Sequence, residues 1–171
     1  MKQTCIVYLV RAAEDRLHAG IIADGYHLPA SVLKVFLRAK GLERLILVSD
    51  AAVMGGKPPG VYKWDAIDVQ VFDDGHLGLA GTEYLAGAGH LLDRGVAQFV
   101  RATGCSLAEA VRLCTVNPAL LFGLPAVHDE PAAGMPANLT RFTWRPDSEI
   151  LAVDKTLLGG RLLYSREGGS A

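Results

Sequence analysis

The sequence has few of the features that mark a protein that binds nucleic acid or membranes. It contains no run rich in lysine or arginine, and 17 basic against 18 acidic side chains leave a formal net charge of −1. A chain with so little excess charge has no general attraction for polyanions or anionic lipid surfaces. The apolar stretch TCIVYLV near the N-terminus is too short to span a membrane, and no small-residue cleavage site of a signal peptide follows it. We therefore expect no binding to nucleic acid or to membranes.

Cysteines are also few. Cys5, Cys105 and Cys114 form no C-x-x-C pair, and their number is odd. Free thiols of this kind fit a reducing cytoplasm better than a disulfide framework, so we expect a cytoplasmic protein. Hydrophobic residues make up 50% of the chain and charged residues 20%, which is sufficient for a packed core. A length of 171 residues holds one domain, or one domain with a small appendage.

Residues 20–50 predict a strand, a helix and a second strand. The apolar run AGIIAD stops at the turn signal Asp24-Gly25. In the following helix, Ser31 is the expected cap and Gly41 the expected stop. The run LILVS is apolar throughout, as expected of a strand that is buried on both faces of a parallel sheet. The pattern indicates a right-handed βαβ unit.

The remaining segments predict two antiparallel regions separated by helices. In AIDVQVFDDGHLGLAG apolar and polar residues alternate around Asp74-Gly75, which is typical of a hairpin. Short strands are expected again in NLTRFTW, EILAVDK and TLLGGRLLYS, with a tight turn at Gly159-Gly160. Between them, the sequence predicts a long helix over residues 83–103 that ends at Gly104, then two shorter helices. The capping residues that we expect for these helices are Thr82, Ser106 with Glu109, and Asn117.

Polar residues follow both strands of the predicted βαβ unit. The first strand ends in Asp24-Gly25-Tyr26-His27 and the second in Ser49-Asp50. Carboxyl ends of parallel strands meet at one edge of a sheet, and an aspartate with a histidine there suits metal binding or proton transfer. Simpler interpretations are also open: Asp50 caps the next segment, Asp24 is a turn residue and His27 is a surface histidine. Ser49 lacks a G-x-S-x-G surround, so a nucleophilic role is disfavoured.

The other histidines show no spacing that is typical of metal ligands. No H-x-H or H-E-x-x-H pattern is present. We interpret them as ordinary helix, hairpin or loop residues. They are His18, His76, His90 and His128.

Five consecutive blocks resemble a known enzyme family. The blocks are IIADGYHLP, LILVSDA, LAGTEYLAGA, SLAEAVRLCTVNPALLFGL and GMPANLTRF. Their order is similar to that of the amidohydrolase superfamily, and most of all to the carboxyl-terminal half of N-acetylglucosamine-6-phosphate deacetylases. The resemblance runs from about Arg11 to about Tyr164, while MKQTCIVYL has no counterpart.

The resemblance implies a fold, a reaction and roles for particular residues. Family members are (β/α)₈ barrels with a small β-sandwich, and they hydrolyse the amide of an N-acetyl amino sugar by means of a water bound to zinc or a similar divalent metal. Asp50 matches the aspartate that acts as general base and acid on that water. His27 matches a histidine that polarises the acetamido group, and Gly81, Thr82 and Glu83 match a segment that contacts the sugar.

The resemblance also implies that this chain holds an incomplete site. The family's metal ligands, a glutamate and two histidines, lie on earlier barrel strands that have no counterpart here. We therefore expect no metal to bind this chain alone, with Asp50 as the one candidate contributor. The predicted fold class is α/β: the last two strand–helix units of a (β/α)₈ barrel (residues 1–60 and 82–124) with β-sandwich elements (61–81 and 134–166) and a flexible tail (167–171).

Three hypotheses account for such a chain. The first is an inactive portion of a deacetylase. The second is a C-terminal half that complements a separate N-terminal chain or assembles as a homo-oligomer. The third is a binding module without catalysis, for which Asp50 would be dispensable.

Overall fold

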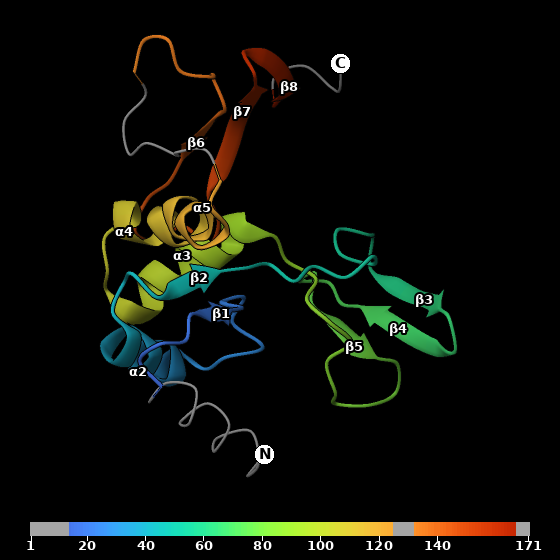
Figure 1. Cartoon of the computed structure of the whole chain (residues 1–171). Helices are drawn as coiled ribbons and strands as arrows, with labels where there is room; N and C mark the ends of the chain where they lie inside the picture. Colours follow the sequence, from blue (N-terminus) through green and yellow to red (C-terminus); the bar gives the residue numbers. More distant parts are fainter. Residues whose placement is uncertain (1–13, 125–131, 167–171) are drawn as a thin grey trace.

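The computed structural model describes residues 14–124 and 132–166, which form three small sheets and four helices (Figure 1). The segment MKQTCIVYL, His128 and the expected flexible tail 167–171 lie outside these described residues. The elements are β1 (Ala19–Ile21), α2 (Ala30–Lys40), β2 (Leu45–Leu47), β3 (Gly60–Trp64), β4 (Ile67–Val71), β5 (Leu77–Leu79), α3 (Leu92–Thr103), α4 (Leu107–Cys114), α5 (Val116–Phe122), β6 (Leu139–Thr143), β7 (Ala152–Leu158) and β8 (Arg161–Ser165).

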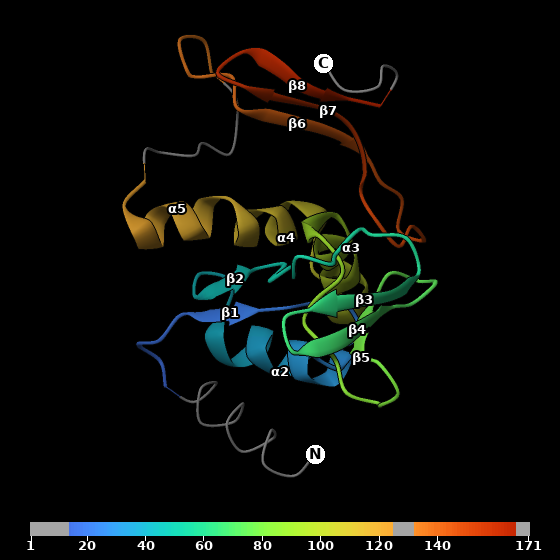
Figure 2. The ribbon, with the colours of Figure 1, turned by 90° about the vertical axis from the view of Figure 1, so that its right-hand side faces the viewer.

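The predicted βαβ unit is confirmed. Strands β1 and β2 pair in parallel, with Ala19 opposite Leu45 and Ile21 opposite Leu47. Figure 2 shows α2 against one face of this pair and α4 with α5 against the other. All three residues of β2 are buried, as the wholly apolar run predicts for a strand that is covered on both faces. The core that joins these layers includes Ile21, Leu33, Phe36, Leu45, Leu47, Phe99 and Leu113.

The second sheet, β3-β4-β5, is antiparallel and contains the predicted hairpin. Its turn is at Asp74-Gly75, and it has a third strand, β3, which the sequence analysis did not separate from the preceding loop. Val69 and Val71 are buried while their neighbours on β4 are more exposed, as alternation predicts for a sheet with one covered face. The third sheet, β6-β7-β8, is also antiparallel, and Gly159-Gly160 makes the expected turn. Figure 2 shows this sheet beyond α5, on the side away from β1 and β2.

The long helix expected over residues 83–103 begins only at Leu92, so that prediction of its start is wrong. Residues 83–91 instead run through bends and isolated bridges, including Ala51 with Ala88. The glycines explain the difference: a Cβ at Gly89 would collide with the carbonyl oxygen of Gly75, and one at Gly87 would lie 2.9 Å from the Cβ of Ala52. Close backbone approach therefore overrides the helical pattern of this segment.

The capping predictions have mixed outcomes. Ser106 and Glu109 form the expected capping box, in which each side chain bonds the other residue's backbone N–H. The left-handed conformation of Gly104 (φ 79°) ends α3, and Gly41 ends α2. Ser31 does not cap α2, which begins at Ala30 after Pro29.

Thr82 and Asn117 are not helix caps either. No helix begins directly after Thr82, and its hydroxyl donates to the carbonyl oxygen of Leu79 at 3.0 Å. Asn117 lies within α5, which begins at Val116, and its side chain bonds backbone groups around β2. Over the described ranges, none of the helices has the length and apolar character needed to cross a membrane.

Candidate active site

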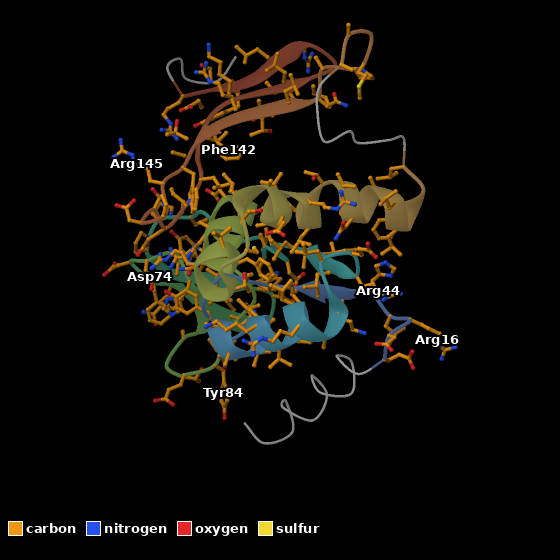
Figure 3. The ribbon with its side chains drawn as sticks, turned by 90° about the vertical axis from the view of Figure 1, so that its left-hand side faces the viewer. Arg16, Arg44, Asp74, Tyr84, Phe142 and Arg145 are labelled. Carbon is orange, nitrogen blue, oxygen red and sulfur yellow. The ribbon has the colours of Figure 1, made fainter. Side chains whose placement is uncertain are left out.

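The polar residues that follow β1 and β2 lie at the same edge of the parallel pair. Asp24 and His27 are in the loop after β1, and Asp50 is three residues beyond the end of β2. Figure 3 shows Arg16 and Arg44, which precede the two strands, on the opposite side of the molecule from Asp74, which lies near this loop. The edge is therefore the carboxyl-terminal one, where loops of parallel α/β sheets converge.

Asp24 is a turn residue, as one of the open interpretations held, and it also binds the ring of His27. Its Oδ1 accepts backbone N–H groups from Tyr26 at 2.9 Å and from His27 at 3.0 Å. Its Oδ2 lies 2.8 Å from Nδ1 of His27. Burial by itself would raise the pKa of this carboxyl group, but the hydrogen bonds from His27 and Tyr26 prevail and lower the pKa to about 2. Asp24 is therefore a buried carboxylate at neutral pH.

His27 is partly exposed, with 24% of its side chain accessible. The hydrogen bond to Asp24 raises the pKa of the imidazole, and partial burial opposes this effect. The negative charge of Asp50 also raises the pKa of His27, by a smaller amount, because it favours the positively charged ring. The pKa of the His27 imidazole therefore lies above its usual value.

Asp50 is exposed and has a left-handed backbone conformation, with φ 48°. Such a conformation is uncommon for a residue other than glycine, although aspartate tolerates it better than most. The chain turns at this point, and the next residue, Ala51, forms a parallel bridge with Ala88. The carboxyl group of Asp50 is thereby left at the rim rather than in the core.

The turn of Gly81, Thr82 and Glu83 is exposed and follows β5. Its hydrogen bonds are local, since the hydroxyl of Thr82 also accepts the backbone N–H of Tyr84 at 3.2 Å. Figure 3 shows Tyr84 at the border of the molecule and away from Asp74.

The structure brings the side chains of Asp74, His76 and His90 close to Tyr26 in the loop after β1, which the sequence analysis did not predict. The hydroxyl of Tyr26 donates to Asp74, whose Oδ1 lies 2.6 Å from Nδ1 of His76. The ring of Tyr26 stacks on His76 with centroids 4.5 Å apart, and it lies 5.7 Å from the ring of His90. Burial and the bond to Asp74 raise the pKa of Tyr26 to about 12. These contacts tie the loop after β1 to the β4–β5 hairpin, and no local spacing signals them because Tyr26 and Asp74 are 48 positions apart.

The described residues do not by themselves fit a metal centre. Within residues 14–124 and 132–166, no three or more histidine, cysteine, aspartate or glutamate side chains come together as metal ligands would. Asp50 and His27 are two such groups at one edge, and the ring of His27 is engaged by Asp24 through Nδ1. A metal at this edge would need ligands from outside the described residues.

Comparison with known proteins connects this arrangement to one enzyme family. No family model matches the chain. The chain is 31% identical over 149 residues to "N-acetylglucosamine-6-phosphate deacetylase" of Rattus norvegicus, covering 86% of this chain and 34% of the relative. It is 34% identical over 117 residues to "N-acetylgalactosamine-6-phosphate deacetylase" of Escherichia coli O157:H7, covering 67% of this chain and 29% of the relative. It thus spans about a third of these relatives' length.

Solved structures agree with the sequence relatives. The chain superimposes on N-acetyl-D-glucosamine-6-phosphate deacetylase of Mycobacterium smegmatis with a TM-score of 0.76 and 29% identity, over 91% of this chain and 40% of that one. The same resemblance, over nearly the whole chain, was expected from the five sequence blocks. The chain is therefore a member of the amidohydrolase superfamily, related to the N-acetylglucosamine-6-phosphate deacetylases.

Proposed function

We propose that the chain forms part of the active site of a deacetylase that hydrolyses the acetamido group of an N-acetyl amino sugar 6-phosphate. The observation that carries this proposal is the position of His27 and Asp50 after two adjacent parallel strands. Relatives that are named for this reaction match the chain over most of its length. Because these relatives act on both gluco and galacto sugars, we propose the substrate class and not one epimer.

The proposed roles follow from the chemistry of the two groups. A protonated His27 donates a hydrogen bond to the amide oxygen and stabilises the negative charge that develops there. The exposed carboxylate of Asp50 accepts a proton from the attacking water and returns one to the leaving nitrogen. The turn of Gly81, Thr82 and Glu83 contacts the sugar.

The proposed architecture is the last two strand–helix units of a (β/α)₈ barrel, in residues 1–60 and 82–124, with sandwich elements in 61–81 and 134–166. Support comes from the parallel β1–β2 pair between helical layers and from the likeness to deacetylase structures. The divalent metal that the resemblance implies does not fit the described residues alone. The remaining ligands would have to come from outside the described residues, with the carboxylate of Asp50 as a candidate ligand.

Acetate release from N-acetylglucosamine-6-phosphate tests the proposal. The purified chain would be assayed with and without zinc, alone and together with a polypeptide that carries the amino-terminal part of a related deacetylase. Asp50→Asn is expected to abolish activity. Asp65→Asn is the matched control because Asp65 also has a positive φ, of 52°, but lies in the β3–β4 turn. No acetate release in any of these mixtures would contradict the proposal.

A second candidate is a chain that acts only in complex with another polypeptide. In the part of the chain that the structure describes, β1 has a single strand neighbour, β2, and residues of β1 line a cavity of about 260 Å³. The cavity is lined by Leu17, His18, Ala19, Gly20, Ile21, Leu28 and Phe36. An unpaired edge of this kind accepts a further strand. Activity that appears only with the added polypeptide would favour this candidate, whereas a tight complex that is unaffected by Asp50→Ala and never active would favour a binding module.

A further inference from the structure

Asp24 has more contacts with the loop after β1 than a turn residue requires. It is 4% exposed, and its carboxylate meets three N–H positions: the backbone of Tyr26, the backbone of His27 and the His27 ring. Its own carbonyl oxygen accepts a hydrogen bond from Nε of Arg94 at 3.3 Å, which fastens the loop to α3. Burial of a carboxylate costs free energy unless hydrogen-bond donors compensate it. The loop supplies these donors to Asp24.

The geometry determines which ring nitrogen of His27 carries the proton. An ionised carboxylate has no hydrogen to donate, so the 2.8 Å contact requires a hydrogen on Nδ1. Nε2 is then the ring atom available to a substrate, and the ring cannot rotate without losing the Asp24 bond. Asp24 and Asp50 are the charges that act on the ring, and both favour the imidazolium, in which Nε2 is also a donor.

We propose that Asp24 is a positioning residue that keeps a hydrogen on Nδ1 of His27 and fixes the orientation of the ring, so that Nε2 of the protonated ring donates to the amide oxygen of the substrate. The part played by His27 rests on the proposed function. The tautomer and orientation of the ring rest on the contacts of Asp24 alone. Asp24 touches no reacting atom and acts only through His27.

Asp24→Asn tests this proposal because two backbone N–H groups determine the orientation of the asparagine side-chain amide. Oδ1 of Asp24 is held by two backbone N–H groups, so the single oxygen of asparagine takes that place. Its NH₂ group then occupies the position of Oδ2 and donates to Nδ1 of His27. The neutral ring therefore has to carry its proton on Nε2, the reverse of the native tautomer.

The experiment is ¹⁵N NMR of the 171-residue chain with labelled histidine, in which the His27 signals are assigned by their absence in His27→Gln. We expect neutral His27 to be protonated on Nδ1 in the native chain and on Nε2 in Asp24→Asn, with a lower ring pKa in the variant. Asp74→Asn is the matched control, since Asp74 binds Nδ1 of His76, and it should alter His76 but not the His27 tautomer. An Nε2-protonated neutral ring in the native chain overturns the proposal without any need for a folded variant. So does an unchanged tautomer in a folded Asp24→Asn.

A second measurement separates this inference from the proposed function. In the acetate-release assay, Asp24→Asn should lower kcat about 100-fold and leave KM within a few-fold. The variant loses the carboxylate that favours the imidazolium, and a neutral ring with a hydrogen on Nε2 stabilises the negative charge of the transition state less than a charged one does. A variant that folds and keeps the native kcat contradicts the positioning role. If the native protein releases no acetate in any mixture, the proposed function is wrong. The ¹⁵N result still decides whether Asp24 holds the hydrogen on Nδ1 of His27.

Discussion

Asn117 is expected to be one of the most important polar residues for stability. It is 2% exposed, and its Nδ2 donates to the carbonyl oxygens of Leu42 and Leu45 at 2.6 and 2.7 Å. Asn117→Ala leaves both carbonyls without that donor. Leu45 is fully buried, so its unmet carbonyl costs about 1–3 kcal/mol, and the partly exposed Leu42 adds about 1 kcal/mol. We expect the free energy of unfolding to fall by about 2–4 kcal/mol.

Urea denaturation followed by circular dichroism at 222 nm measures this loss. For a chain of this size the same change lowers Tm by about 4–16 °C. Asn138→Ala is the matched control, because Asn138 is exposed and accepts one backbone N–H from Gly159. The control should lose no more than about 0.5 kcal/mol. Equal losses in the two variants would show that the bonds between α5 and the start of β2 contribute little, which would refute the reasoning.

Three further predictions address other parts of the fold. Ser106→Ala removes one half of the capping box of α4 and should lower the free energy of unfolding, measured in urea, by about 1 kcal/mol. Glu109→Gln keeps a hydrogen-bonding side chain and should lose less. No loss in Ser106→Ala would contradict the stabilising role of the cap. Gly89→Ala should cost roughly 2 kcal/mol or more, because its Cβ meets the Gly75 backbone, whereas Gly95→Ala in α3 has its nearest neighbour at 3.9 Å and should be tolerated. The pKa of Asp24 falls from 3.8 to about 2 on folding, so its stabilisation of roughly 2 kcal/mol is present above pH 4 and lost as the pH falls toward 2. Asp24→Asn should therefore flatten the dependence of the free energy of unfolding on pH between 4 and 2, and parallel curves would contradict it.

Much of the fold was predictable because local rules govern it. The apolar run of β2 predicts a strand that is buried on both faces, and the structure confirms it. Ser106 with Glu109 and the turns at Asp74-Gly75 and Gly159-Gly160 are each decided by a few neighbouring residues. Such signals do not depend on what packs against the segment.

The errors arose where distant backbone decides the conformation. Residues 83–91 have a helical pattern, yet Gly87 and Gly89 bring the chain against Ala52 and Gly75, which no local pattern reports. Asn117 precedes a proline, as a helix cap often does, but its amide meets carbonyls that lie 72 to 75 positions away. The side chain is used for a tertiary bond, which contributes more in a buried position than an exposed cap does.

The candidate site divides in the same way. The sequence by itself determined that His27 and Asp50 follow adjacent strands, because parallel pairing places both strand ends at one edge. Only the tertiary structure decided that Asp24 binds the His27 ring, and that Asp74 and His76 reach Tyr26 from a hairpin some fifty positions away. The pairing of β1 with β2 follows from a local strand–helix–strand pattern. The partner of a polar side chain depends instead on how packed elements meet in space, which the spacing of residues along the chain does not report.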